Sequence, residues 1–316
     1  MPFLEKRFGG RKNDALGFDA GTVGDRALWS EQGIGGVEQR RLCGNSECSN
    51  AWTAPWRSKK RPVFEGQWGC GGRCVLAMVR NAVRRELGDG ATAPQPHRHR
   101  VPLGLLMLAQ GWITHPQLRR ALEAQRESGS GRIGDWLVSE CGLEAEQITR
   151  GLSMQWSCPV LPMTGFEPQT MALVMPRIFV EEFGLLPLRV AGSRILYLAF
   201  EDRLDAAAAL AIEQMTELKV ESGLLDGREF EPARRRLLEH ESVPLKLEAA
   251  ADLDDLSARI TAILEQKQPL ASRLVRLHRH YWLRVWLERD AMRGVGTLPK
   301  SSEDVGDFVF TLGGSA

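Results

Sequence analysis

The stretch PLGLLMLAQGWI at residues 102–113 recurs thirty residues later as RIGDWLVSECGL at residues 132–143. Most apolar positions of the two stretches coincide without a gap. The register continues in three further pairs, Leu118 with Ile148, Leu122 with Leu152 and Gln125 with Gln155. The chain therefore contains a tandem repeat, and such a repeat indicates one structural unit formed twice.

Each copy is predicted to form a short helix, a turn near Gly111 or Gly142, and a longer helix with apolar residues every three or four positions. In the first copy, Thr114 followed three residues later by Gln117 is a capping-box arrangement. In the second copy Glu144 takes the place of Thr114, so we expect that helix to lack the cap. Its start would instead be stabilised by packing and by acidic side chains near the positive end of the helix dipole.

This tandem resembles the N-terminal domain shared by type II secretion and type IV pilus assembly ATPases, whose repeat runs Arg-Leu-Gly, an apolar pair, Gly, and then Leu, Leu and Gln. The resemblance extends over about residues 102 to 240. It continues in five later stretches, Pro159-Val160, Leu173 to Pro176, Phe183 to Leu188, the hairpin around Gly192, and Asp202 to Asp205. The resemblance implies a small helical subdomain followed by an α/β sandwich.

In some members of that family the paired repeats bind cyclic di-GMP. Carried onto this sequence, the resemblance implies a ligand site formed by Leu103, Gly104, Gln125, Arg132, Ile133, Gly134 and Gln155. Two positions depart from the pattern, because Pro102 replaces the first arginine and Cys141 replaces a glycine. Two hypotheses stay open, a nucleotide site and a repeat that serves packing and docking.

Four cysteines precede the repeat as Cys43-x4-Cys48 and Cys70-x3-Cys74, beside several glycines. Two cysteine pairs on glycine-containing turns can converge on a structural zinc ion. Four thiolates would complete its coordination and leave no position for water. A strand-like Pro62 to Glu65 and a helix-like Val75 to Glu86 make the order similar to a zinc ribbon or treble clef. Disulfides or redox thiols, and unpaired buried cysteines, are the alternatives.

Composition and charge set wider limits on function. Lys plus Arg number 41 and Asp plus Glu number 40, so no overall charge attracts the protein to nucleic acid or to an anionic membrane. The sequence has neither a run of about twenty apolar residues nor the apolar core of a signal peptide. We expect a cytoplasmic protein without membrane insertion.

No catalytic pattern is found in the sequence. There is no Gly-x-x-x-x-Gly-Lys-Ser/Thr phosphate loop, no His-Glu-x-x-His and no nucleophile elbow. We therefore expect that the protein is not an enzyme.

The expected fold class is α+β, with six segments: a disordered N-terminus (1–40), a zinc module (41–88), a linker (89–101), the helical repeat (102–158), an α/β sandwich (159–243) and a helical C-terminal extension (244–316). Within the extension, Leu253 to Gln266 and Leu270 to Arg293 have apolar residues at helical spacing, while Phe308 to Thr311 resembles a strand. His278 and His280 are expected on a solvated face.

Three functions follow from these features. The first is a non-catalytic adaptor that binds a protein partner, such as a secretion or pilus ATPase or its inner-membrane platform. The second is a cyclic di-GMP sensor that uses Arg132. The third, a nucleic-acid-binding zinc protein, rests on tryptophans near Arg57 to Arg61, which could instead pack around the metal.

Overall fold

The computed structural model describes residues 43–49, 62–89, 100–288 and 298–313. The predictions for the N-terminal segment 1–40, for most of the linker 89–101, and for the tryptophans and basic residues between 50 and 61 lie outside these ranges.

The repeat region consists of two pairs of helices. They are α2 (Leu103–Ala109), α3 (His115–Ser128), α4 (Ile133–Cys141) and α5 (Ala145–Trp156). Gly111 and Gly142 both have φ of 70°, a left-handed conformation that glycine adopts without steric cost. Met107, Ala121 and Leu137 are fully buried at the centre of a core to which all four helices contribute.

The starts of the two long helices are capped in the same way. The backbone N–H of Thr114 donates to Oε1 of Gln117 at 2.8 Å, and the N–H of Glu144 donates to Oε1 of Gln147 at 2.9 Å. The expectation that the second copy lacks this cap is therefore wrong, because the glutamine at the third helical position satisfies the backbone donor whichever residue precedes the helix.

The next region is a three-stranded sheet with helices. Its elements are α6 (Pro168–Met171), α7 (Arg177–Phe183), β3 (Leu185–Ala191), β4 (Ile195–Phe200), α8 (Ala206–Thr216), β5 (Lys219–Leu224) and α9 (Gly227–Leu238). The strand order is β3-β4-β5. Strands β3 and β4 pair antiparallel, whereas β4 and β5 pair parallel through the α8 crossover.

The helical C-terminal extension predicted over 244–316 is wrong, apart from one helix, whereas the strand expected at Phe308 to Thr311 is present. The region contains β6 (Leu245–Ala250), α10 (Leu253–Lys267), β7 (Ala271–Leu277), β8 (His280–Trp286), a 3₁₀ turn (Ser302–Asp304) and β9 (Val305–Leu312). The segment predicted as a second helix is the β7–β8 hairpin, and its turn contains His278 with φ of 52°. The four strands form one sheet in the order β6-β9-β8-β7.

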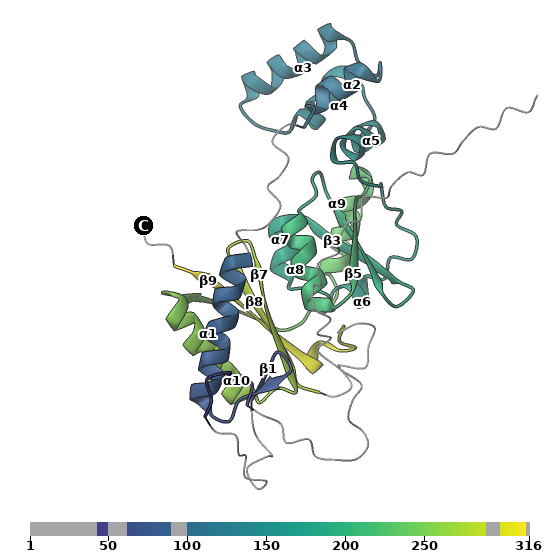
Figure 1. The fold of residues 1–316 in the computed structure, drawn as a ribbon. Coiled ribbons are helices and arrows are strands. Elements are labelled where there is room, and N and C mark those ends of the chain that lie inside the picture. Colours follow the sequence, from purple (N-terminus) through teal and green to yellow (C-terminus); the bar gives the residue numbers. More distant parts are fainter. Residues whose placement is uncertain (1–42, 50–61, 90–99, 289–297, 314–316) are drawn as a thin grey trace, which may run out of the picture. The chain divides into compact units, whose positions relative to one another are not determined.

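One face of this sheet is covered by a helix from the N-terminal side of the chain. A short hairpin, β1 (Val63–Phe64) and β2 (Gln67–Trp68), leads into α1 (Gly72–Asp89). Val75 and Val79 of α1 pack in one core with Leu256 of α10 and Leu283 of β8, so α1 and α10 lie together on the sheet (Figure 1). The segments predicted as a zinc module and as a C-terminal extension thus share one hydrophobic core.

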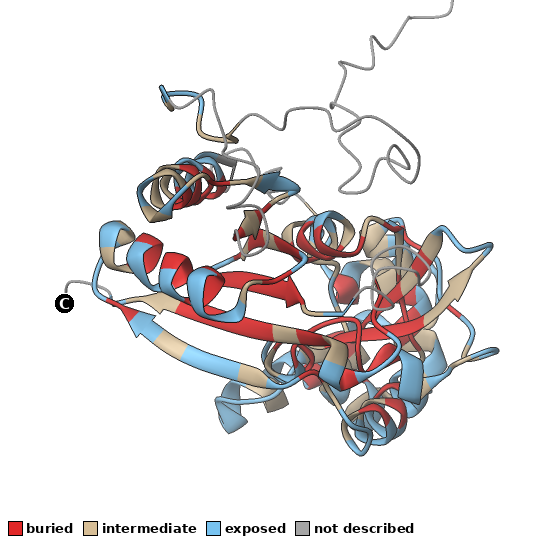
Figure 2. Ribbon diagram, turned by 90° about the horizontal axis from the view of Figure 1, so that it is seen from below, coloured by how far each residue is buried: buried red, intermediate tan, exposed pale blue. Residues whose placement is uncertain are grey.

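Strand β8 is buried on both faces, which appears as a continuous red strand in Figure 2. Tyr281, Leu283 and Val285 face the core shared with α1 and α10. Of the residues that alternate with them, Trp282 meets Phe179 of α7 edge-on at 5.4 Å, and Arg284 donates to the carbonyl of Val174 at 3.0 Å. A strand covered on both faces loses the apolar–polar alternation by which strands are recognised in sequence.

Candidate metal centre and repeat site

The four cysteines are brought together by a turn, a hairpin and a helix start. Cys43 and Cys48 lie on a turn in which the N–H of Cys48 donates to the carbonyl of Asn45 at 3.0 Å. The N–H of Gly44 donates to the carbonyl of Trp68 at 2.9 Å and ties this turn to β2. Cys70 follows β2 after Gly69, and Cys74 lies in the first turn of α1.

The hairpin between the two cysteine pairs reverses the chain in two residues. Glu65 and Gly66 have φ of 47° and 74°, and positive φ at both central positions is the conformation of a type I′ turn. The expected strand at Pro62 to Glu65 is the first half of this hairpin. The predicted helix from Val75 to Glu86 is the central part of α1.

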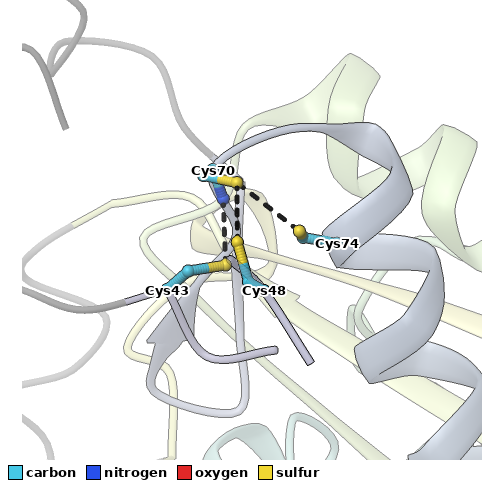
Figure 3. A group of neighbouring side chains, drawn as sticks. All are labelled: Cys43, Cys48, Cys70 and Cys74. Atoms are coloured by element: carbon cyan, nitrogen blue, oxygen red, sulfur yellow. Dashed lines mark hydrogen bonds between the residues drawn. The ribbon is translucent and has the colours of Figure 1, made fainter. Parts of the chain in front are cut away.

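The four sulfur atoms all lie within 4.8 Å of one another (Figure 3). Sγ of Cys70 is 3.5 Å from Sγ of Cys48 and 3.4 Å from Sγ of Cys74, and its backbone N–H donates to Sγ of Cys43 at 3.4 Å. A tetrahedral zinc site with Zn–S bonds of about 2.3 Å has sulfur–sulfur edges of about 3.8 Å. The donor set and its spacing therefore fit a metal ion of this kind.

Crowding of the thiols shifts their pKa values in opposite directions. Burial, together with hydrogen bonds to the neighbouring thiols, raises the pKa of Cys70 to about 12. Burial also acts to raise the pKa of Cys43, but backbone hydrogen bonds from Asn45 and Cys70 outweigh it and lower that pKa. Four thiolates at this spacing would repel one another, and a bound cation would remove that repulsion.

The other two cysteines lie apart from this cluster. Cys158 is buried, and Sγ of Cys141 donates to the carbonyl of Gln117 at 3.4 Å. Burial raises the pKa of both thiols. They behave as small side chains of the repeat region.

Arg132, the residue on which the nucleotide hypothesis depends, is held by two carboxylates. Its guanidinium contacts both carboxylate oxygens of Glu201, at 2.8 and 3.4 Å, and lies 3.4 Å from Asp202. Both acids follow β4 directly, in the three-stranded sheet region. The hydrogen bonds to Glu201 raise the pKa of Arg132 above its ordinary value.

Glu201 and Asp202 were missed as partners of Arg132 in the sequence. Next to Asp205, they could be interpreted as acids gathered near a helix N-terminus. Asp205 does cap α8 and accepts from the N–H of Ala208 at 3.0 Å. No sequence signal connects Glu201 with an arginine 69 positions earlier, because only the fold brings the two together.

The two glutamines predicted for the ligand site have equivalent roles in the two copies. Nε2 of Gln125, at the end of the first copy, donates to the carbonyl of Gly131 at 3.0 Å, just before the second copy. Nε2 of Gln155, at the end of the second copy, donates to the carbonyl of Val101 at 2.8 Å, just before the first. Each copy thus fixes the start of the other, and both amide groups are engaged within the protein.

The remaining predicted ligand residues lie at helix–helix contacts. Leu103 is buried, and a Cβ on Gly104 would lie 2.5 Å from Cδ1 of Leu118. A Cβ on Gly134 would lie 3.1 Å from Cγ2 of Ile148, while Ile133 packs at the edge of the repeat core. Their positions are explained by close packing of the short helices on the long ones.

No protein-family profile matches the chain. Over 96 residues, 30% of its length, the chain is 33% identical to the type IV pilus assembly ATPase PilB of Myxococcus xanthus strain DK1622. The chain contains a region similar to the N-terminal domain of secretion and pilus ATPases. This confirms the resemblance expected from the repeat. The match spans 17% of the length of PilB.

Two solved structures also align with part of the chain. A structure of MshE with cdg covers 44% of the chain and 99% of its own length, at 26% identity and a TM-score of 0.37. A structure of the N-terminal domain of XpsE covers 42% of the chain and 92% of its own length, at 21% identity and a TM-score of 0.29.

Among the described residues, no helix is both long enough and apolar enough to cross a membrane.

Proposed function

We propose that the protein is a non-catalytic adaptor whose secretion-ATPase-like region binds a protein partner, namely a component of a secretion or pilus machine. The observation that carries the proposal is the engagement of Arg132 by Glu201 and Asp202. A nucleotide phosphate would have to displace two carboxylates from this cation, and Pro102 supplies no second cation in the other copy.

The surface of the repeat region supports docking of a protein. Each of its four helices exposes one large apolar side chain, and these are Leu105, Leu122, Val138 and Met154, which are 36 to 50% exposed. Apolar side chains in the interior of an interface contribute most when they become fully desolvated. We therefore assign partner binding to the repeat.

The four cysteines are proposed to hold a structural zinc ion in a treble-clef-like arrangement. Four thiolates complete the coordination of zinc and leave no position for a catalytic water. The ion would join the turn with Cys43 to the start of α1, and α1 is part of the core under the C-terminal sheet. The role of the zinc ion would thus be structural, because it would fix the turn with Cys43 to α1.

The adaptor proposal is tested by measuring binding of the full-length, metal-loaded protein to purified secretion or pilus ATPase from the same organism. The double substitution Leu105→Ser and Val138→Ser should weaken binding by about tenfold or more. Leu210→Ser on α8 is a matched control, because Leu210 and Leu105 are both 50% exposed. Equal loss of binding in the control, or no binding of any such ATPase, would contradict the proposal.

A cyclic di-GMP sensor is the second candidate, since Arg132-Ile133-Gly134 is intact and MshE was solved with cdg. Calorimetric titration of cyclic di-GMP into the full-length protein distinguishes the two functions. A sensor should bind, should lose binding on Arg132→Ala, and should bind more tightly on Glu201→Gln with Asp202→Asn. The adaptor proposal expects no heat of binding from the wild-type protein.

A further inference from the structure

The edge strand β6 has the features of a self-pairing interface. Among the described residues β6 pairs with β9 alone, and it forms one end of the sheet order β6-β9-β8-β7. Its neighbour β9 is mostly buried, whereas Lys246, Leu247 and Ala249 of β6 are exposed (Figure 2). Leu247 is 59% exposed, more than any other large apolar side chain in the described part of the chain.

The backbone of β6 offers a regular set of hydrogen-bonding groups on its outer side. The carbonyls of Pro244 and Ala250 accept from Asp307 and Gly313, at 3.1 and 2.8 Å, on the β9 side. Because successive residues of a strand direct their N–H and C=O groups to opposite sides, those of Leu245, Leu247 and Ala249 point away from β9. A strand laid along this side would find three residues ready to pair.

The side chains of β6 are complementary to a second copy of the same strand. In an antiparallel pairing centred on Leu247, that residue faces its own counterpart, and each Lys246 faces the Glu248 of the other copy. Leu245 likewise faces Ala249, so the three residues with outward backbone groups form hydrogen-bonded pairs. A parallel in-register pairing would instead place like charges together. Charges often block exposed edges, but opposite signs placed symmetrically about Leu247 favour one register.

We propose that the protein forms a homodimer in which two β6 strands pair antiparallel about Leu247 and join two four-stranded sheets into one. Lys246 and Glu248 determine the register, and Leu247 forms the apolar centre. Glu248 also lies 3.4 Å from Arg259 of α10, so the interface ion pairs extend onto the helical face of the sheet. The interface is small and the dimer therefore depends on protein concentration.

The test uses sedimentation velocity of the full-length protein over a concentration series. Lys246→Glu places glutamates opposite each other, and Glu248→Lys places lysines opposite each other, so each single variant should raise the dimer dissociation constant about tenfold or more. Combining both substitutions in one chain restores opposite charges and should restore the dimer. Circular dichroism and thermal unfolding establish that each variant is folded.

A mixture of the two single variants provides the sharpest result. One strand then carries two glutamates and the other two lysines, so the mixture should form heterodimers although each variant alone is monomeric. Leu247→Pro, which removes the central N–H donor, should abolish the dimer. A monomeric wild-type protein at every concentration, or a dimer insensitive to these charge changes, would overturn the proposal.

Discussion

Arg284 on β8 and Asp307 on β9 form an ion pair at 2.8 Å in which both side chains are almost completely buried. Asp307 also accepts from Nε1 of Trp282 at 2.8 Å, and Arg284 reaches the carbonyl of Val174. The pair therefore lies where the C-terminal sheet meets the region that contains α7. Each guanidinium nitrogen of Arg284 and each carboxylate oxygen of Asp307 thus has a hydrogen-bond partner within the protein.

Removal of one partner should be costly because it leaves a buried charge unpaired. We expect Arg284→Met to lower the free energy of unfolding by about 3–5 kcal/mol. Combining Arg284→Met with Asp307→Asn removes both charges, and the double variant should lose less than the sum of the two single variants. Chemical denaturation of the three variants measures these differences, and strict additivity would show that the two charges are not coupled.

The C-terminal sheet also shows where sequence interpretation failed. The hairpin β7–β8 contains apolar residues such as Leu274, Leu277, Tyr281 and Val285, whose spacing of three or four mimics a helix. The residues between them, among them Trp282 and Arg284, are buried on the opposite face. With both faces covered by parts of the chain remote in sequence, no alternating pattern is left to detect.

Of the two histidines expected on a solvated face, His278 is exposed, whereas His280 was misinterpreted for a related reason. His280 is buried, with Nε2 3.0 Å from Glu182 of α7, and Nε2 of His278 lies 2.5 Å from Asp205. Both carboxylates lie more than seventy positions earlier in the chain, so local sequence gives no hint of them. Local signals did succeed for the hairpin around Gly192, where a glycine turn separates the two apolar runs that form β3 and β4.

The contact between His278 and Asp205 should make stability depend on pH. The hydrogen bond to Asp205 raises the pKa of His278 above its ordinary value of 6.5. Burial opposes ionisation of Asp205, but hydrogen bonds from His278 and the α8 backbone lower its pKa. The stabilisation is therefore fully present between the ordinary pKa values of Asp205 and His278, 3.8 and 6.5. It is lost as the pH rises through the raised pKa of His278 or falls through the lowered pKa of Asp205.

Thermal unfolding of wild type and His278→Gln at pH 5.5 and pH 9 tests this dependence. The midpoint of thermal unfolding of the wild type should exceed that of the variant by more at pH 5.5 than at pH 9. Comparing the two proteins at the same pH cancels the titrations that both share. Asp205→Asn is the matched variant, because asparagine still caps α8 while the charge is lost. A difference that does not change with pH would exclude a charged pair at this position.

The proposed zinc ion predicts a link between metal and stability. Purified protein should contain about one zinc per chain, and Cys74→Ser or treatment with a chelator should remove the metal and lower the midpoint of thermal unfolding. Cys141→Ser makes the same chemical change outside the cluster and should leave the zinc content unchanged. Elemental analysis measures the zinc content, and thermal denaturation measures the stability of each variant. Wild-type protein with far less than one zinc per chain would refute the assignment.

The equivalent glycines of the two copies should respond differently to the same substitution. Gly104→Ala brings a methyl group against Leu118 and should destabilise the repeat by about 1–3 kcal/mol. At Gly134 the approach to Ile148 is less close, so the gain of about 1 kcal/mol in helix propensity should offset most of the cost. Urea denaturation of both variants measures the change in the free energy of unfolding. Equal destabilisation would mean that the difference in packing around the two glycines does not affect stability.

The core shared by α1 and the C-terminal sheet has a consequence for synthesis on the ribosome. Helix α1 ends at Asp89, but β9, which supplies Phe308 and Phe310 to the same core, begins only at Val305. At about 5–20 residues per second, on the order of ten seconds or more separates the emergence of the two segments. During that interval the repeat and the three-stranded sheet are already synthesised, while the apolar face of α1 is not yet covered by β9.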